Sequence, residues 1–150
     1  MAFCSSWVGR PNSLTIAGID SPISVRGTVD RIDRYNGNIR VLDYKTGIIG
    51  KLGITDWNLL AKDPGLGQAR QLLLYAMLWN DADPTEKANQ AGIIALKEHD
   101  KGVRYVGEKV SARNINSELT PAIMEQATAV FTEIIQNLFN TDLPFSEPEA

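Results

Sequence analysis

The sequence predicts an α/β domain in which a mixed central β-sheet is flanked by helices. Three observations lead to this fold class. A β-hairpin pattern lies between residues 23 and 44, two helix patterns lie at residues 67–82 and 119–140, and two strand patterns separate those helices. A chain of 150 residues is long enough for one such domain with its own core. We expect a single domain spanning residues 1–150, and we expect it to be a piece of a longer protein.

The first part of the chain is predicted to be mostly strand. Leu14–Ala17 is a short apolar strand candidate, and Ile23–Arg34 and Asn38–Tyr44 show the alternation and β-branched content of longer strands. The glycine-rich segment that follows Tyr44 is expected to be a long connection with a short helical turn at Trp57–Ala61. Connections of this length inside a compact domain are often functional.

The second part alternates helices and strands. Gly67–Ala82 is rich in helix formers and apolar on nearly all sides, which predicts a helix buried between layers. Residues 89–98 predict a central strand, and residues 102–110 predict a strand nearer an edge. Residues 119–140 predict a helix that Thr120 caps and Pro121 begins. The apolar stripe of this last helix is Ile123, Ala127, Phe131, Ile134 and Leu138.

Composition excludes several classes of protein. The single cysteine, Cys4, rules out an internal disulfide and a cysteine-rich metal or iron–sulfur site. The chain opens without a signal peptide, and its longest apolar run, Leu72–Trp79, is too short to span a bilayer. We therefore expect a soluble, cytoplasmic protein without membrane contact. The net charge of −3 argues against a surface that is basic overall, which nucleic-acid binding usually requires.

The hairpin poses a chemical problem. The dipeptide Asn36-Gly37 favours a two-residue type I′ turn, which fixes the register so that Asp33 lies opposite Arg40 and Asp30 opposite Asp43. Like charges directly opposite each other are destabilising, and partial burial adds a desolvation cost. Strand alternation places Lys45 on the same face as both carboxylates, whereas Arg31, Asp33, Arg40 and Tyr44 lie on the other face.

A divalent cation between the carboxylates resolves both costs. Mg²⁺ is commonly held by one or two carboxylates together with water and phosphate oxygens. Phosphodiester hydrolysis needs such an ion, which neutralises the phosphate and supplies hydroxide near neutral pH. Lys45 can then stabilise developing negative charge. The spacing alone is also compatible with an ordinary surface hairpin in which Asp30 is solvated and Asp43-x-Lys45 is incidental.

The motifs together resemble a known family. The stretch "GTVDRIDRYNGNIRVLDYKTG" followed by "QLLLYA" is similar to the PD-(D/E)XK nuclease superfamily, and in particular to its RecB-like exonuclease branch, which includes RecB and AddB nuclease domains and Cas4 proteins. The pattern of that branch is present in order from Gly27 to Tyr75. The resemblance implies a restriction-endonuclease-like core and a Mg²⁺- or Mn²⁺-dependent DNA exonuclease active in DNA repair or recombination.

The resemblance also implies roles for single residues. Asp30, Asp43 and the backbone carbonyl of Tyr44 would be metal ligands, and Lys45 would be the catalytic lysine. Gln71 and Tyr75 would face the site from the following helix, which agrees with their i, i+4 spacing on one helix face. Taken alone, these two side chains also fit hydrogen-bonded core residues. Gly27 and Gly47 bracket the motif, where a close backbone approach or a turn is plausible.

The chain departs from the family pattern in two respects. Many relatives carry an acidic residue or histidine on a helix before the hairpin, and no residue here matches it; His99 lies in an expected loop and is left out of the site. Some relatives carry four cysteines for an iron–sulfur cluster, one upstream and three after a "PF" segment; the given sequence ends with "LPFSEPEA", before the position of those three, so it does not support a cluster in this chain. No nucleotide-binding P-loop is present, so a helicase would be another domain or subunit.

Three functions remain open. The first is the DNA nuclease, with DNA gripped mainly by another domain or by a local basic patch drawn from Lys51, Arg70, Lys101 and Arg104. The second is a non-catalytic DNA-binding or subunit-interaction module of the same fold. The third is an unrelated α/β binding protein with a chance motif.

Overall fold

The computed structural model describes residues 7–8, 12–97 and 99–144. Its main sheet has four strands in the order β5-β6-β8-β9, namely β5 (Arg31–Tyr35), β6 (Asn38–Lys45), β8 (Gln90–Ala95) and β9 (Val103–Tyr105). The β6–β8 pair is parallel and the other two pairs are antiparallel. The expected mixed sheet is therefore confirmed. Cys4 and residues 145–150 lie outside the described residues.

The turn between β5 and β6 has the predicted chemistry. Asn36 and Gly37 both have positive φ values, 49° and 83°, as a type I′ turn requires. The register is also as predicted, since Tyr35 pairs with Asn38, Asp33 with Arg40 and Arg31 with Leu42. A local turn signal has thus fixed which side chains share each face of the hairpin.

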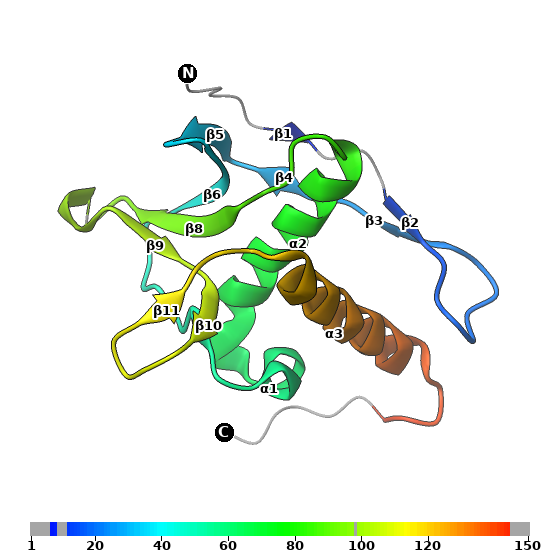
Figure 1. Cartoon of the computed structure of the whole chain (residues 1–150). Helices are drawn as coiled ribbons and strands as arrows, with labels where there is room; N and C mark the ends of the chain where they lie inside the picture. Colours follow the sequence, from blue (N-terminus) through cyan, green and yellow to red (C-terminus); the bar gives the residue numbers. More distant parts are fainter. Residues whose placement is uncertain (1–6, 9–11, 98, 145–150) are drawn as a thin grey trace.

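Helix α2 (Gly67–Ala82) connects the parallel strands β6 and β8 and packs between the main sheet and α3 (Pro121–Phe139), as Figure 1 shows. None of the residues from Gly67 to Asn80 is exposed, which confirms the predicted helix buried between layers. The core joins apolar side chains of α2, α3 and one face of the sheet, among them Val41, Leu73, Ile93 and Phe131.

Helix α3 begins as expected. The Thr120 side chain accepts a hydrogen bond from the Ile123 amide, and Pro121 lies in the first turn. The stripe is buried at Ile123, Ala127 and Phe131, whereas Leu138 is 57% exposed. The prediction for Leu138 is therefore wrong, because the last part of the helix extends away from the sheet and α2 (Figure 1).

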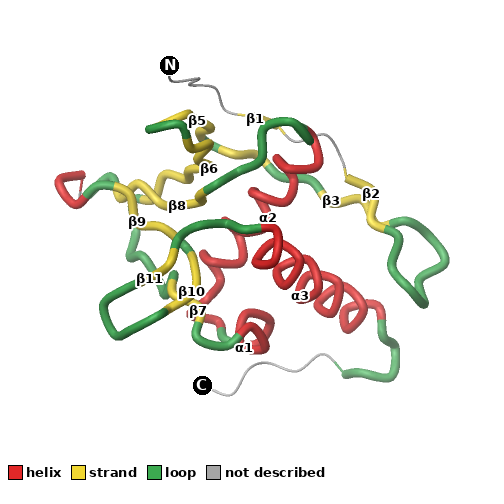
Figure 2. Tube along the Cα trace, viewed as in Figure 1, coloured by secondary structure: helices red, strands yellow, loops and turns green. Residues whose placement is uncertain are grey.

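The long connection after β6 is more ordered than the sequence indicated (Figure 2). It contains β7 (Gly53–Ile54), α1 (Trp57–Lys62) and the 3₁₀ turn η1 (Pro64–Leu66). The Gln68 side chain accepts from the Gly50 amide at 2.8 Å and donates to the Ile48 carbonyl at 3.1 Å. The first turn of α2 thereby fastens the chain that follows Lys45.

The strands near the start of the chain differ from those expected. The region from Ile23 to Arg34 forms β3 (Ile23–Val25), β4 (Thr28–Val29) and β5, with breaks at Arg26-Gly27 and at Asp30. Strand β3 pairs with β2 (Asn12–Leu14), and β4 pairs with β1 (Trp7–Val8). The first expected strand, Leu14–Ala17, instead ends at Leu14, and Gly18 turns with a φ of 84°.

The expected strand at residues 102–110 divides at Val106. Beyond β9, β10 (Gly107–Lys109) joins a second sheet of order β11-β10-β7 with β11 (Ile115–Asn116). A Cβ on Gly107 would lie 1.9 Å from the Asn116 carbonyl oxygen, so the close approach of β10 to β11 requires glycine. The turn η2 (His99–Lys101) precedes β9. Among the described residues, no helix has the length and apolarity needed to cross a membrane.

Candidate active site

Asp43 lies near the end of β6 on the sheet face that α2 covers. Asp43 is 4% exposed, and the Nζ of Lys45 lies 2.9 Å from the Oδ2 of Asp43. This contact is an ion pair, and Oδ2 receives no hydrogen bond within the part of the chain that the structure describes. Burial raises the pKa of the Asp43 carboxyl, a shift that Lys45 counteracts and Asp30 reinforces.

Asp30 reaches the same place from a break between β4 and β5. The ladder of the hairpin ends at Arg31 and Leu42, so Asp30 is not in a continuous strand as the sequence suggested. Its Oδ2 instead accepts a hydrogen bond of 2.8 Å from the backbone amide of Tyr44. The bend brings the Asp30 carboxylate close enough for its charge to raise the pKa of Asp43.

Two side chains of α2 complete the cluster. Lys45 Nζ donates to Gln71 Oε1 at 3.0 Å, and Gln71 Nε2 donates to the Tyr75 hydroxyl at 2.8 Å. The spacing i, i+4 on one helix face makes this relay possible. Because both amide atoms of Gln71 are engaged, its orientation is fixed, and it holds the Lys45 ammonium beside Asp43.

The two glycines that bracket the motif differ. A Cβ on Gly27 would lie 2.9 Å from Cε1 of Tyr75, so the backbone there approaches the tyrosine ring closely. No heavy atom lies within 4 Å of a Cβ placed on Gly47. Only at Gly27, therefore, does the lack of space for a side chain require glycine.

The opposite face of the hairpin carries a separate polar network. Asp33, 2% exposed, accepts from Arg40 Nε at 2.7 Å, from Arg40 Nη2 at 2.8 Å and from Arg31 Nε at 2.9 Å. Arg40 also donates to the Tyr105 hydroxyl at 3.0 Å. Burial opposes ionisation of Asp33, but the two arginines outweigh it and hold its pKa below the ordinary value. This network supports the predicted division of the hairpin into two faces.

The donor set suits one kind of cation. Within residues 7–8, 12–97 and 99–144, no group of three or more His, Cys, Asp or Glu side chains is arranged to hold a metal. Two carboxylates remain, one of them with a buried oxygen that lacks a hydrogen bond. A hard cation such as Mg²⁺, which accepts one or two carboxylates and completes its shell with other oxygens, fits this arrangement.

Comparison with known proteins is consistent with this chemistry. A family model described as the PD-(D/E)XK nuclease superfamily matches residues 4–149. The chain belongs to this superfamily. Nucleases of the PD-(D/E)XK superfamily use divalent metal ions, and membership implies a metal-dependent nuclease with DNA as substrate. Searches of curated proteins and of solved structures find no significant match.

Sequence reasoning missed part of the surroundings of this candidate site. Gln68, one helical turn before Gln71, was not recognised as the residue that fastens the loop after Lys45. Its position three residues before Gln71 on the same helix face was the available signal. No helix precedes Asp30 in the described residues, which form strands β1–β4 there. The structure therefore offers no upstream helical acid or histidine in that part of the chain.

The expected basic patch is only partly assembled. Lys51 and Arg104 line one hollow, whereas Arg70 donates to the carbonyls of Leu60 and Asp63 and has a structural role. Lys101 lies in η2 and is not among the residues that line the hollow.

Proposed function

We propose that the chain is a Mg²⁺- or Mn²⁺-dependent DNA exonuclease of the RecB-like branch, active on cytoplasmic DNA in repair or recombination. The observation that carries the proposal is the pairing of Asp43, whose buried Oδ2 lacks a hydrogen bond, with the Asp30 carboxylate beside it. Lys45 offsets only part of the cost of burying this carboxylate beside a second negative charge, so a bound cation would stabilise the site.

In this proposal Asp30, Asp43 and the Tyr44 backbone carbonyl hold the cation. The Asp30–Tyr44 hydrogen bond supports this, because it fixes one carboxylate against the backbone that supplies the third oxygen. A bound divalent cation supplies Lewis acidity, which neutralises the phosphate and makes hydroxide available near neutral pH.

Lys45 is proposed as the catalytic residue that stabilises negative charge on the phosphate in the transition state. The 3.0 Å contact with Gln71 directs the ammonium toward Asp43, and Tyr75 in turn orients Gln71. Gln71 and Tyr75 are thus positioning residues, since each acts through its neighbour.

A nuclease assay with Mn²⁺ or Mg²⁺ tests the proposal. Linear single-stranded and double-stranded DNA should be degraded from ends, and circular DNA of the same sequence should be resistant if the action is exonucleolytic. Asp43→Asn should abolish the activity and Lys45→Ala should lower it strongly, whereas Asp81→Asn, at an exposed aspartate near the end of α2, should leave it unchanged. Activity that persists in Asp43→Asn would contradict the assignment.

The alternative is a non-catalytic DNA-binding or subunit-interaction module of the same fold. The Lys45–Gln71–Tyr75 relay favours the nuclease, because a module without catalysis does not need an ammonium held beside a buried carboxylate. We further propose that a helicase domain or subunit of the parent protein or complex delivers the DNA, since the net charge of this chain is −3.

A further inference from the structure

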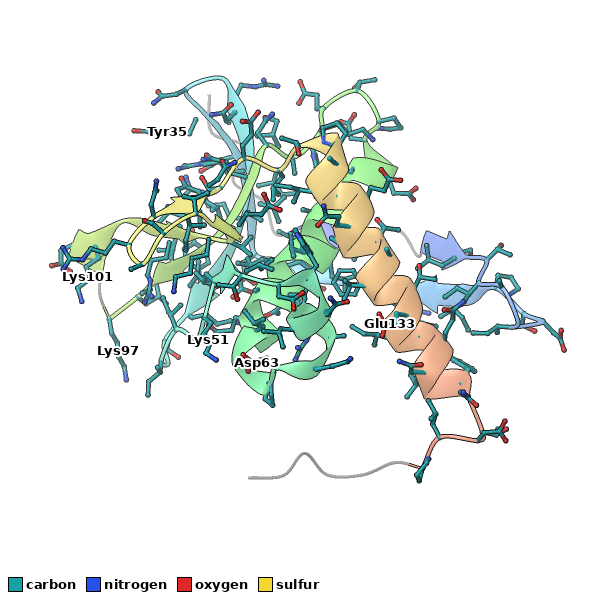
Figure 3. The ribbon with its side chains drawn as sticks, turned by 60° about the horizontal axis from the view of Figure 1, so that its bottom comes forward. Tyr35, Lys51, Asp63, Lys97, Lys101 and Glu133 are labelled. Carbon is teal, nitrogen blue, oxygen red and sulfur yellow. The ribbon has the colours of Figure 1, made fainter. Side chains whose placement is uncertain are left out.

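A hollow at the segment that follows Lys45 is lined by several cationic side chains. It has a volume of about 760 Å³ and lies between the segment that follows Lys45, strand β9 and the β10–β11 hairpin. Its cationic lining residues are Lys51, Arg104, Lys109 and Arg113. Figure 3 shows Lys51 with Asp63 close by, and Lys97 on the same side of the molecule.

More cationic side chains than carboxylates line the hollow. Asp63 is the carboxylate among the lining residues, and Lys51 lies 2.8 Å from its Oδ2. Glu108 is in β10, but its carboxylate accepts from Trp57 Nε1 and does not line the hollow. Its neighbour Lys109 does line it, because successive side chains of a strand point to opposite sides.

Most of these cations have no ion-pair partner among the described residues. Arg104, Lys109 and Arg113 are exposed, and none of them forms an ion pair with another described residue. In a chain with a net charge of −3, such a concentration of unpaired positive charge indicates an anionic ligand.

The hollow shares a lining residue with a second hollow, which lies at the segment directly after Lys45. A smaller hollow of about 290 Å³ is lined by Thr46 and Gly47, which follow Lys45 directly, and by Ala95, Lys97 and Arg104. Arg104 lines both hollows. Across the sheet, Asp43 pairs with Ile93 and Ile93 pairs with Arg104, so Arg104 lies two strands from Asp43, roughly 10 Å at the usual strand spacing.

We propose that these two hollows hold the sugar–phosphate backbone of a single DNA strand that extends from the candidate active site. This inference rests on the proposed function and adds the path of the substrate. Lys97 and Arg104 contact the phosphates nearest the cleaved bond, and Lys109 and Arg113 contact those farther away. The volume is that of an ordinary ligand pocket, which suits one strand better than a duplex.

Binding measured without cleavage tests this path. Fluorescence anisotropy of a labelled oligo(dT) is recorded in EDTA at several NaCl concentrations, with the full chain. Arg104→Glu and Arg113→Glu should each weaken binding several-fold and reduce the dependence of log K on log salt by about 0.7, the value for one phosphate contact on a single strand. Lys87→Glu is the matched control, since it makes the same change of charge on an exposed lysine outside both hollows.

Each outcome decides the proposal. If Arg113→Glu and Lys87→Glu weaken binding equally, only net charge matters and the proposed path is wrong. A wild-type chain that does not bind oligo(dT) would also overturn the proposal. Tighter binding of a duplex of equal length would overturn the single-strand path. Arg113→Gln, with its fold checked by circular dichroism, should weaken binding less than Arg113→Glu but more than Lys87→Glu. Strand binding that depends on the hollows, without metal-dependent cleavage, would contradict the nuclease and leave the path intact.

Discussion

The Nζ of Lys45 lies 2.9 Å from Oδ2 of Asp43, an oxygen that receives no hydrogen bond in the described part of the chain. The two residues are two positions apart on one strand, so alternation places both on the face that α2 covers. The ammonium compensates part of the cost of burying the carboxylate, yet burial and Asp30 still raise the pKa of Asp43. The cluster is thus complementary to one further positive charge.

Removal of the Lys45 ammonium should affect catalysis more than cation binding. If Lys45 stabilises charge in the transition state, Lys45→Ala should lower kcat by about 10²–10³-fold, the range for loss of one such electrostatic group. Steady-state kinetics on linear DNA with Mn²⁺ measures this effect. A kcat within a few-fold of the wild type would remove Lys45 from the mechanism.

Gln71 should act through Lys45. Gln71→Ala frees the ammonium from its 3.0 Å contact, so kcat should fall by about tenfold while KM changes little, as expected for a lost transition-state interaction. Tyr75→Phe removes only the hydroxyl that accepts from Gln71 and should have a smaller effect. In the background of Lys45→Ala, Gln71→Ala should add almost nothing. Additive losses in that double variant would show that Gln71 acts independently.

Gly27 should be sensitive to a single methyl group. A Cβ there would lie 2.9 Å from Cε1 of Tyr75, so Gly27→Ala should displace the ring and lower the free energy of unfolding by about 1–3 kcal/mol, as overpacking does. Gly47→Ala is the matched control, because its Cβ would meet no heavy atom within 4 Å. Urea denaturation of both variants measures the difference, and equal stability of the two would contradict the close packing.

The buried Asp33 should make stability depend on pH. Its pKa is held below the ordinary value, so its ionised form stabilises the native state above the unfolded pKa of about 3.8. That contribution should be lost as the pH falls below this value toward the lower pKa of the native state. Asp33→Asn should lower stability at neutral pH by about 3 kcal/mol, because Arg40 loses its buried partner.

The measurement is urea denaturation of the wild type and of Asp33→Asn between neutral and acidic pH. The difference in free energy of unfolding between the two proteins should become smaller at acidic pH, because Asp33 is then protonated in both the native and the unfolded state of the wild type. A difference in free energy of unfolding that stays constant over this pH range would show that the charge of Asp33 does not contribute to stability.

The parts of the site that depend on local signals could be predicted from the sequence. The turn at Asn36-Gly37 set the register, which placed Asp33 against Arg40 and Asp30 near Asp43. The helix Gly67–Ala82 was predicted with its bounds, since its composition and length leave few alternatives. The division of the strand at Asp30 was not predictable, because it depends on the hydrogen bond to the Tyr44 amide and on the packing of Gly27 against Tyr75.

The two hollows with their cationic side chains could not be predicted from the sequence. Lys51, Arg104 and Arg113 are far apart in the chain and carry no periodic pattern. They meet because β10 pairs with both β7 and β11, a tertiary arrangement that requires the close approach at Gly107. Arg70, grouped with them on charge alone, instead donates to backbone carbonyls.

Isothermal titration calorimetry with Mn²⁺ measures whether Asp30 and Asp43 bind one cation together. The wild type should bind one Mn²⁺ and gain about 2.7 kcal/mol of stability at a free concentration one hundred times the Kd. Asp30→Asn and Asp43→Asn should each lose both the heat of binding and this stabilisation, whereas Asp81→Asn should retain them. Mn²⁺ binding that is unchanged in Asp43→Asn, or absent in the wild type, would contradict the assignment of this pair as the metal site.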